Sequence, residues 1–340
     1  MNLSKLKYYL SFYVKTSLIP RKILQVYENK CLALLRDSRE RRYILERVKY
    51  YNQLSSRFTI TPGEIKEDGY HITRSLPISD IGYQKVGSFY RYDLLAVSRF
   101  FDPRLWVSFT MGDVTFEPEV PSIVKSRPIA ESGPCERSVI LKLNQLRHFR
   151  FIRDRQSYEE KRNILMWRGS TCNKSHRLSF LQSFYSHPLC DVAQVKEPDS
   201  YAYGDVLSIE QQLRNKFILC IEGNDVATNL KWAMSSNSLC MMVKPKYETW
   251  FMEGLLQPGV HYVQLADDYS DLEQKIVYYS KHVDEAKEII FNANRYIVQF
   301  QNQLREDLIS ILVFSKFLAH SGQIDFPYRN ILDLERLEVL

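Results

Sequence analysis

The sequence predicts an α/β protein that contains a parallel sheet flanked by helices and an additional helical segment at its N-terminus. Two observations support this class. From Ile164 onward, short apolar runs alternate with helical segments of about ten residues or more, an order typical of parallel sheets covered by helices. In residues 4–52, apolar residues fall at roughly helical spacing with Lys and Arg between them. The chain of 340 residues is 45% apolar and 25% charged, which suits two domains or one large one.

The N-terminal helical segment is strongly basic. We expect a break at Ile19-Pro20, because proline cannot continue the interior of a helix. Residues 1–50 contain twelve Lys and Arg against four Asp and Glu, whereas the whole chain has a net charge of +6. The basic surplus therefore lies in this segment alone. Such a segment can form a solvated helical layer, lie on an anionic membrane face or bind nucleic acid.

The middle of the chain has a different texture. Residues 58–128 contain short apolar runs separated by turn signals, which predicts strands and turns. Within them, Tyr90–Arg99 is expected to be helical. Leu105–Thr110 is expected to be a strand that ends at Met111-Gly112-Asp113. Residues 139–165 are mixed and highly charged, and we expect them to include the crossover between two domains.

The alternation that follows defines the predicted parallel sheet. Its expected strands are Ile164–Arg168, Phe217–Ile221, Leu239–Val243 and His261–Leu265. Its expected helices are 174–186, 226–235, 272–279 and a long, broken helix over 283–318.

Several protein classes are excluded at this stage. No apolar run reaches the roughly 18 residues that a membrane-spanning helix needs, and the N-terminus has no small-x-small cleavage site of a signal peptide. The six cysteines are scattered, with no C-x-x-C pair and no histidine at zinc-ligand spacing. We therefore expect reduced thiols in a cytoplasmic protein and no bound metal.

Two junctions between an apolar strand and a following helix are unusually polar, namely Met166–Arg177 and Phe217–Lys231. Ligands of an open parallel sheet bind where such junctions leave the carboxyl ends of the strands. Glycine allows a close approach to the backbone, and a helix N-terminus attracts phosphate. Arg168, Arg177 and Lys231 carry charges that suit a diphosphate. Neither junction is a Walker loop or a G-x-G-x-x-G motif. Each can also be a plain glycine turn with a capping residue, but together they favour an anionic, nucleotide-bearing ligand.

These residues resemble motifs of glycosyltransferase family 90. Trp167-Arg-Gly-Ser170 with Arg177 is similar to the family's W/F-R-G-S…R motif. Val226-Ala-Thr-Asn-Leu-Lys231 resembles V-A-[AS]-x-[FYL]-R, and the run from Pro258 to Leu272 resembles P-W-V-H-Y-I-P-V…D-L-x-x-L. Because several motifs occur in order over roughly residues 100–300, the resemblance is specific. It implies two Rossmann-like domains facing a cleft (the GT-B arrangement) and transfer of a sugar from a UDP-sugar to a hydroxyl, with inversion and without a metal or other cofactor.

The resemblance also assigns donor-binding residues. Ser170, Arg177 and the segment Val226–Lys231 match positions that bind the sugar nucleotide. Glu222 and Asp225 either bond a ribose hydroxyl or cap the following helix. Lys231 departs from the family arginine and loses its bidentate fork, and Gly259 stands where the family has Trp. The full predicted donor site is Trp167, Arg168, Gly169, Ser170, Arg177, Glu222, Gly223, Asp225, Val226, Ala227, Thr228, Asn229 and Lys231.

Asp113 is the candidate catalytic base. The run Leu105–Asp113 resembles the family strand that ends in N-V-R-D-Y-P, whose Asp is the general base, although Met111-Gly112 replaces V-R and Val follows the Asp. Inverting transfer needs one carboxylate that removes the proton of the acceptor hydroxyl. Without the resemblance, an Asp after a strand is usually a turn or a helix cap. Lys125 and Arg127 are candidate contacts to an anionic acceptor.

The predicted organisation is a basic helical segment (1–54), an acceptor-side domain with Asp113 (55–158), a donor-binding domain (159–305) and a C-terminal helix that packs back across the domains (306–340). The absence of an export signal suggests a bacterial cytoplasmic enzyme, peripheral on the inner membrane through residues 1–50. Its expected acceptor is lipopolysaccharide or another lipid-linked surface glycan, and its expected partners do not include nucleic acid. The alternatives are a glycosyltransferase-like protein that has lost catalysis and binds a glycan or partner, and a basic nucleic-acid-binding protein.

Overall fold

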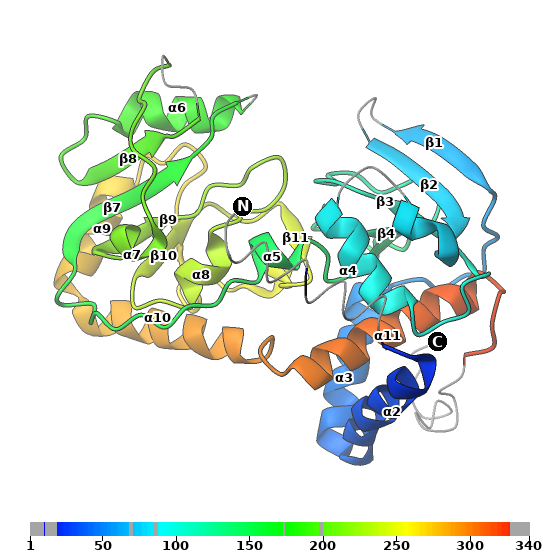
Figure 1. Cartoon of the computed structure of the whole chain (residues 1–340). Coiled ribbons are helices and arrows are strands. Elements are labelled where there is room, and N and C mark those ends of the chain that lie inside the picture. Colours follow the sequence, from blue (N-terminus) through cyan, green and yellow to red (C-terminus); the bar gives the residue numbers. More distant parts are fainter. Residues whose placement is uncertain are drawn as a thin grey trace. The chain divides into compact units, whose positions relative to one another are not determined.

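The computed structural model divides the chain into two compact units, each of which has its own sheet (Figure 1). The first unit comprises residues 1–146, 247–250 and 300–340, and the second comprises 147–246 and 251–299. The structure describes Leu10 and residues 19–67, 71–83, 88–172, 174–196 and 200–326.

The second unit is built on a five-stranded parallel sheet. Its strands are β7 (Arg162–Gly169), β8 (Cys190–Gln194), β9 (Asn215–Leu219), β10 (Leu239–Met242) and β12 (Val263–Gln264). They lie in the order β12-β10-β9-β7-β8, and every neighbouring pair is parallel. The central strand β9 is buried along its whole length, as expected for a strand that is covered on both faces.

Helices cover this sheet. They are α6 (Ser175–Phe184), α7 (Ile209–Gln212), α8 (Leu230–Met234), α9 (Leu272–Lys281) and α10 (Val283–Val298), with a 3-10 turn at Glu253–Leu255. The short helix α5 (Gln145–His148) lies where the chain passes from the first unit to the second. Side chains of β7, β9 and β10 form one apolar core with side chains of α6, α9 and α10.

The first unit has a mixed sheet of five strands in the order β1-β2-β3-β4-β6. These are β1 (Gly63–Glu67), β2 (His71–Pro77), β3 (Trp106–Thr110), β4 (Ser122–Val124) and β6 (Ser138–Ile140). The first three pair antiparallel, and β3, β4 and β6 pair parallel. A separate antiparallel pair joins β5 (Ser126–Pro128) to β11 (Tyr247–Thr249).

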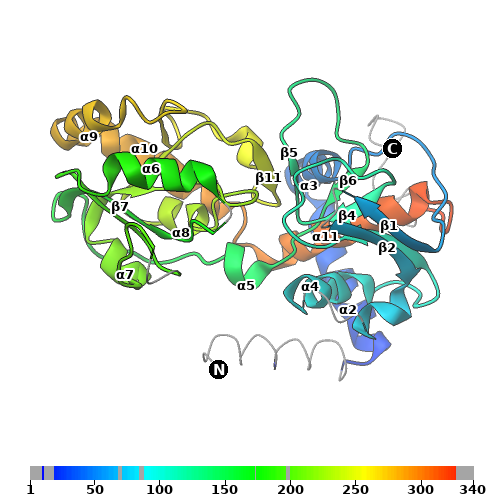
Figure 2. The ribbon, with the colours of Figure 1, turned by 90° about the horizontal axis from the view of Figure 1, so that it is seen from above.

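The helices of the first unit pack around its last helix. They are α2 (Arg21–Leu32), α3 (Ser38–Tyr51), α4 (Ser88–Ser98) and α11 (Gln303–His320), with 3-10 turns at Ala33–Arg36 and Ile78–Tyr83. Figures 1 and 2 both show α2, α3 and α4 around α11. The Glu306 carboxylate accepts hydrogen bonds from Arg47 and, at 2.6 Å, from the indole of Trp250. The Trp250 ring stacks on the Tyr51 ring, with their centroids 3.9 Å apart. Arg47 is 3% exposed, so part of the basic segment belongs to the core rather than to a charged surface.

The predicted α/β class and the predicted strands of the parallel sheet are confirmed, with shifts of a few residues at their ends. The predicted break is also confirmed, since Pro20 directly precedes α2. The helix expected over 226–235 is wrong in extent and covers only Leu230–Met234. Residues 226–229 form an irregular loop, in which the side-chain amide of Asn229 donates to the Leu219 carbonyl of β9 (2.8 Å).

The facing arrangement of two Rossmann-like domains and the boundaries 1–54, 55–158, 159–305 and 306–340 stay predictions. Within the described ranges, no helix is long and apolar enough to cross a membrane.

Candidate functional site

The order in which strands are added to the second sheet reverses between β7 and β9. After β7 the chain forms β8 on one side, and then crosses to β9 on the other side of β7. Such a switch point leaves a crevice outside the strand ends, where ligands of open parallel sheets bind. The loops that leave β7 and β9 are the two polar junctions of the sequence. The sheet order therefore brings the predicted donor residues to adjacent strand ends.

The first loop begins with a tryptophan folded back on a glycine. The indole of Trp167 is 2% exposed and packs edge-on against Phe180. A Cβ at Gly169 would lie 2.3 Å from the indole, so only glycine fits there. The next residue, Ser170, is half-buried, and its hydroxyl accepts from the Cys172 amide at 3.3 Å. The buried indole of Trp167 thus packs directly against the backbone of the loop at Gly169.

Arg168 is held on β8 by a neighbouring acid. Its Nη2 lies 2.6 Å from Oδ1 of Asp191, and its other nitrogens donate to the carbonyls of Asp191 and Asp205. Side chains of successive strand residues point to opposite faces, so Arg168 lies across the sheet from Trp167. The structure does not bring Arg168 to Arg177.

Arg177 joins the two loops. Its Nη1 donates to the Ser170 carbonyl (2.9 Å), and its Nε and Nη2 donate to the carbonyls of Glu222 (2.9 Å) and Ile221 (2.8 Å). The guanidinium lies over the Trp167 ring, 5.5 Å from its centroid. Burial lowers the pKa of Arg177 to about 10, so it stays charged at neutral pH. No carboxylate in the described part of the chain contacts this guanidinium, and its positive charge is available to an anion.

Gly223 brings the second loop close to two cationic side chains. A Cβ at Gly223 would lie 3.4 Å from Nη2 of Arg177 and 3.9 Å from Cε of Lys174. The carbonyl of Glu222 also contacts Nε2 of His176 (3.0 Å), while its carboxylate accepts from the Lys246 amide (2.9 Å). Lys174 and His176 are not among the predicted donor residues. Their position one turn and one residue before Arg177 is the signal that could have indicated them.

The rest of the second loop is largely buried beneath the polar residues of the site. Asp225, Val226 and Ala227 are buried, and Thr228 and Asn229 are half-buried. The Asp225 carbonyl accepts from the Gly223 amide at 3.0 Å, which closes the turn. Because α8 begins at Leu230, with Asn229 at the N-cap position, the alternative that Glu222 or Asp225 caps this helix is wrong.

Lys231 lies inside the unit. Its side chain is 1% exposed and is paired with the Glu253 carboxylate, which is equally buried. Its Nζ also lies 5.1 Å from the centroid of the Phe251 ring. In this structure Lys231 is neutralised by Glu253 and does not reach the loop surface, and a contact with a diphosphate stays a prediction.

The candidate base lies in the first unit, in the turn after β3. Gly112, at φ +116°, makes the turn beside His71, and a side chain there would be strained. The Oδ1 of Asp113 accepts from Nζ of Lys125 at 2.6 Å and from the Tyr90 hydroxyl at 3.2 Å. The Asp113 side chain is 27% exposed, whereas Lys125 is 1% exposed. A solvent-accessible carboxylate is thus held by a buried cation, a position that suits proton transfer from a bound hydroxyl.

The two candidate acceptor contacts are both buried. Lys125 contacts Asp113, as described, and Arg127 pairs with Glu248 of β11 at 2.8 Å. Arg127 also donates to the carbonyls of Tyr50 (2.8 Å) and Ser138 (3.2 Å). The structure therefore brings Lys125 but not Arg127 to the candidate base. A role of either residue in acceptor binding stays a prediction.

In the part of the chain that the structure describes, no group of three or more His, Cys, Asp or Glu side chains could hold a metal ion.

Comparisons with known proteins agree with the motifs. The family model for glycosyl transferase family 90 matches residues 142–320. The chain is 42% identical over 278 residues to the O-glucosyltransferase LpsA of Dichelobacter nodosus, which covers 81% of this chain and 83% of the relative. It also matches uncharacterized protein 179R of Invertebrate iridescent virus 6, at 31% identity over 37% of this chain and 11% of the viral protein. The predicted resemblance is confirmed: the chain belongs to glycosyl transferase family 90 and is a glycosyltransferase.

Proposed function

We propose that this glycosyltransferase transfers a sugar, with inversion, from a UDP-sugar to a hydroxyl of lipopolysaccharide or a related surface glycan, without a metal. The name of its relative, O-glucosyltransferase LpsA, makes UDP-glucose the first donor to test. The fold expected for this reaction is the GT-B arrangement, with the donor bound by the second unit and the acceptor by the first.

The single observation that carries the donor side is the position of Arg177 at the switch point. Its guanidinium spans the ends of β7 and β9 and is held by three backbone carbonyls. Carbonyl dipoles orient the guanidinium but leave its net charge in place, so a diphosphate that enters the crevice gains a charge-assisted contact. As the bond from the anomeric carbon to the diphosphate breaks, negative charge grows on the leaving oxygen, and Arg177 stabilises it. Lys174 and the turn at Gly223 complete this side.

Asp113 acts as the base on the acceptor side. The acceptor hydroxyl transfers its proton to the Asp113 carboxylate while its oxygen attacks the anomeric carbon from the face opposite the diphosphate. The bond to the diphosphate breaks, and UDP leaves. Lys125 holds the carboxylate in place before the attack, because its buried ammonium donates to Oδ1 of Asp113 at 2.6 Å. Lys125 is then a positioning residue rather than an acceptor contact.

The decisive experiment replaces Asp113 by Asn and measures sugar transfer and UDP-glucose hydrolysis in the presence of EDTA. We expect turnover to fall by about 10²–10⁴-fold, the usual contribution of a general base. Activity of the wild type in EDTA would support metal independence. Binding of UDP, followed by thermal shift, should be unchanged.

The matched control is Asp80→Asn, an exposed acid of the same unit, which should keep full activity. Equal turnover of the Asp113→Asn and Asp80→Asn variants would remove Asp113 from the mechanism. The configuration of the product, read by proton NMR, tests inversion, and a retained configuration would contradict it.

Docking on an anionic membrane face is part of the proposal. On α2, Lys22, Val26 and Lys30 follow one another at four-residue spacing and are all exposed, which places apolar and basic groups on one surface. Each basic residue near an anionic membrane adds about 1 kcal/mol of binding.

A further inference from the structure

The first unit contains a pocket that none of the proposed catalytic residues lines. It has a volume of about 220 Å³ and is lined by residues of α2, α4 and α11. Its walls are mainly apolar and include Ile23 and Leu24 from α2, Ala96 and Val97 from α4, Phe100 and Ile311. An apolar cavity of about 150 Å³ already holds benzene, so this pocket can take a segment of hydrocarbon chain.

One wall of the pocket carries a cation in an unusual setting. The Nε of Arg99 is shielded from solvent and has no hydrogen-bond partner among the residues that the structure places. Its guanidinium carbon lies 5.6 Å from the centroid of the Phe100 ring. Burial lowers the pKa of Arg99, and Asp307 opposes this shift only through space. An anion beside Arg99 would supply the partner that this buried donor lacks.

The nearest acid of the pocket is already engaged. Asp307 accepts from the hydroxyl of Tyr27 at 2.6 Å and from the amide of Gln303 at 2.8 Å. The other lining cation, Lys142, lies 3.4 Å from Glu306. The hydroxyl and amide that bond Asp307 are neutral and leave its charge, which acts on Arg99 through space. The shielded Nε of Arg99 is the position at which the pocket can take a hydrogen-bond acceptor, such as an anionic oxygen.

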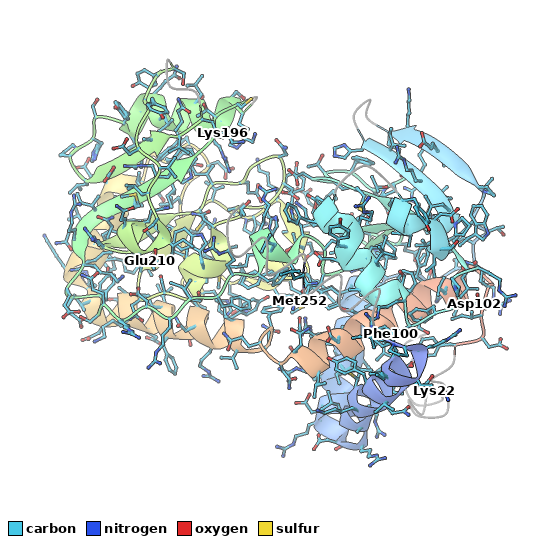
Figure 3. The ribbon with its side chains drawn as sticks, viewed as in Figure 1. Lys22, Phe100, Asp102, Lys196, Glu210 and Met252 are labelled. Atoms are coloured by element: carbon cyan, nitrogen blue, oxygen red, sulfur yellow. The ribbon has the colours of Figure 1, made fainter. Side chains whose placement is uncertain are left out.

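The outer surface of α2, next to the pocket, also combines apolar and basic side chains. Ile23, which lines the pocket, is 56% exposed, and Val26 is 69% exposed. Lys22 lies beside Ile23 in α2. Figure 3 labels Lys22 and also Phe100 of the pocket wall. Apolar side chains flanked by basic ones are typical of helices at the surface of an anionic membrane. The pocket thus begins at a surface that suits the same ligand.

We propose that this pocket holds one acyl chain of an anionic phospholipid, with the negatively charged head group paired to Arg99. The proposal extends the membrane docking described above from a charged surface to a discrete lipid site. It does not depend on Asp113 or on the donor crevice. A lipid bound in this way would add specificity for lipid charge and chain to the non-specific attraction of α2.

The test is calorimetric titration of the full chain with dihexanoyl-phosphatidylglycerol below its micelle concentration. Two reference ligands separate the contributions: dihexanoyl-phosphatidylcholine has chains without net charge, and glycerophosphoglycerol has the charged head group without chains. We expect saturable binding of the first and at least tenfold weaker binding of both others. The Asp113→Asn variant should bind the lipid like the wild type, so failure here is distinguishable from failure of the proposed reaction.

Two variants test the pocket itself. Ala96→Phe fills it and should abolish saturable binding, with Val97→Phe as a second filling variant if the first does not fold by thermal melting. The control Val298→Phe adds the same side chain at a position of the second unit that is 59% exposed. Arg99→Gln should weaken phosphatidylglycerol to the level of phosphatidylcholine, whereas Arg104→Gln, at an arginine side chain that is 88% exposed, should not.

Three results would overturn the proposal. The first is no saturable binding of any of the three ligands to the wild type. The second is equal binding to the wild type and to both filling variants, which would mean that lipid contacts only the surface of α2. The third is a folded Arg99→Gln variant that still prefers phosphatidylglycerol.

Discussion

Arg177 and Lys231 occupy two regions of the same unit and were predicted to share one task, yet their surroundings differ. Arg177 is held by the carbonyls of Ser170, Ile221 and Glu222. Lys231 is held by the carboxylate of Glu253 in a region that solvent does not reach. Carbonyls leave a cation with its full charge, whereas a carboxylate cancels it. The partner, and not the presence of a basic residue in a motif, therefore decides which cation can serve an anionic ligand.

Among the cations of the two motifs, the largest effect on sugar transfer is expected at Arg177. Its replacement by Met removes the uncompensated charge at the switch point, so transfer should fall by about 10²–10³-fold, as when a donor that stabilises a transition state is lost. UDP binding by calorimetry should weaken in parallel. The control Arg168→Met removes a cation of the same motif that Asp191 already neutralises, and UDP binding should stay within a few-fold of the wild type. Equal loss of UDP binding in both variants would show that the ion pair with Asp191 does not distinguish Arg168 from Arg177.

Lys231→Met should instead reduce stability. It leaves Glu253 buried without its cation, and breaking such a pair costs about 3–5 kcal/mol. The free energy of unfolding, measured with denaturant, should fall by this amount, while the folded protein binds UDP as before. The double variant Lys231→Met with Glu253→Gln should recover part of the loss. A folded, equally stable Lys231→Met variant with tenfold weaker UDP binding would show that Lys231 contacts the diphosphate, as the motif first indicated.

Lys125 tests the same comparison in the first unit, because it too is paired with a carboxylate. Lys125→Met should lower kcat about tenfold with little change in the KM for the donor, since Asp113 loses the cation that holds it. Lys125→Arg should restore part of kcat. An unchanged kcat in Lys125→Met would reduce Lys125 to a packing role.

Lys316 of α11 is a buried cation that donates to the Asn52 carbonyl at 3.0 Å. Burial lowers the pKa of Lys316 from 10.5 to about 8. Between these two values the unfolded chain binds more protons than the folded one, so stability contributed by this residue rises with pH. Compared with Lys316→Met, the wild type should gain on the order of 3 kcal/mol from pH 8 to 10.5. Parallel pH profiles of the two proteins in urea would contradict this.

Four of the five strands of the parallel sheet could be predicted because they contain short apolar runs between helical segments. Strand β8 was not predicted, since its sequence, Cys-Asp-Val-Ala-Gln, contains no such run. The two ligand loops could be predicted as well, since they follow strands β7 and β9 at the strand ends. The state of each cation could not be predicted. Glu253 lies 22 residues after Lys231, and nothing in the spacing indicates that the two side chains meet inside the protein.

The first unit was less predictable than the second. Its sheet receives strands from residues 63–140, but its core also needs Trp250 and the helix at Gln303–His320. Sequence periodicity finds each helix but not its partner, so the burial of Arg47 against Glu306 could not be read from a segment that looks uniformly basic.

The division of the first unit into three chain segments has a consequence for how the protein is made. Helices α2 and α3 leave the ribosome early, but α11, on which they pack, is translated after the entire second unit. At ~5–20 residues per second, their apolar faces stay unpacked for tens of seconds until α11 has been synthesised. During synthesis these early helices are therefore the part of the chain most in need of a chaperone or another temporary cover.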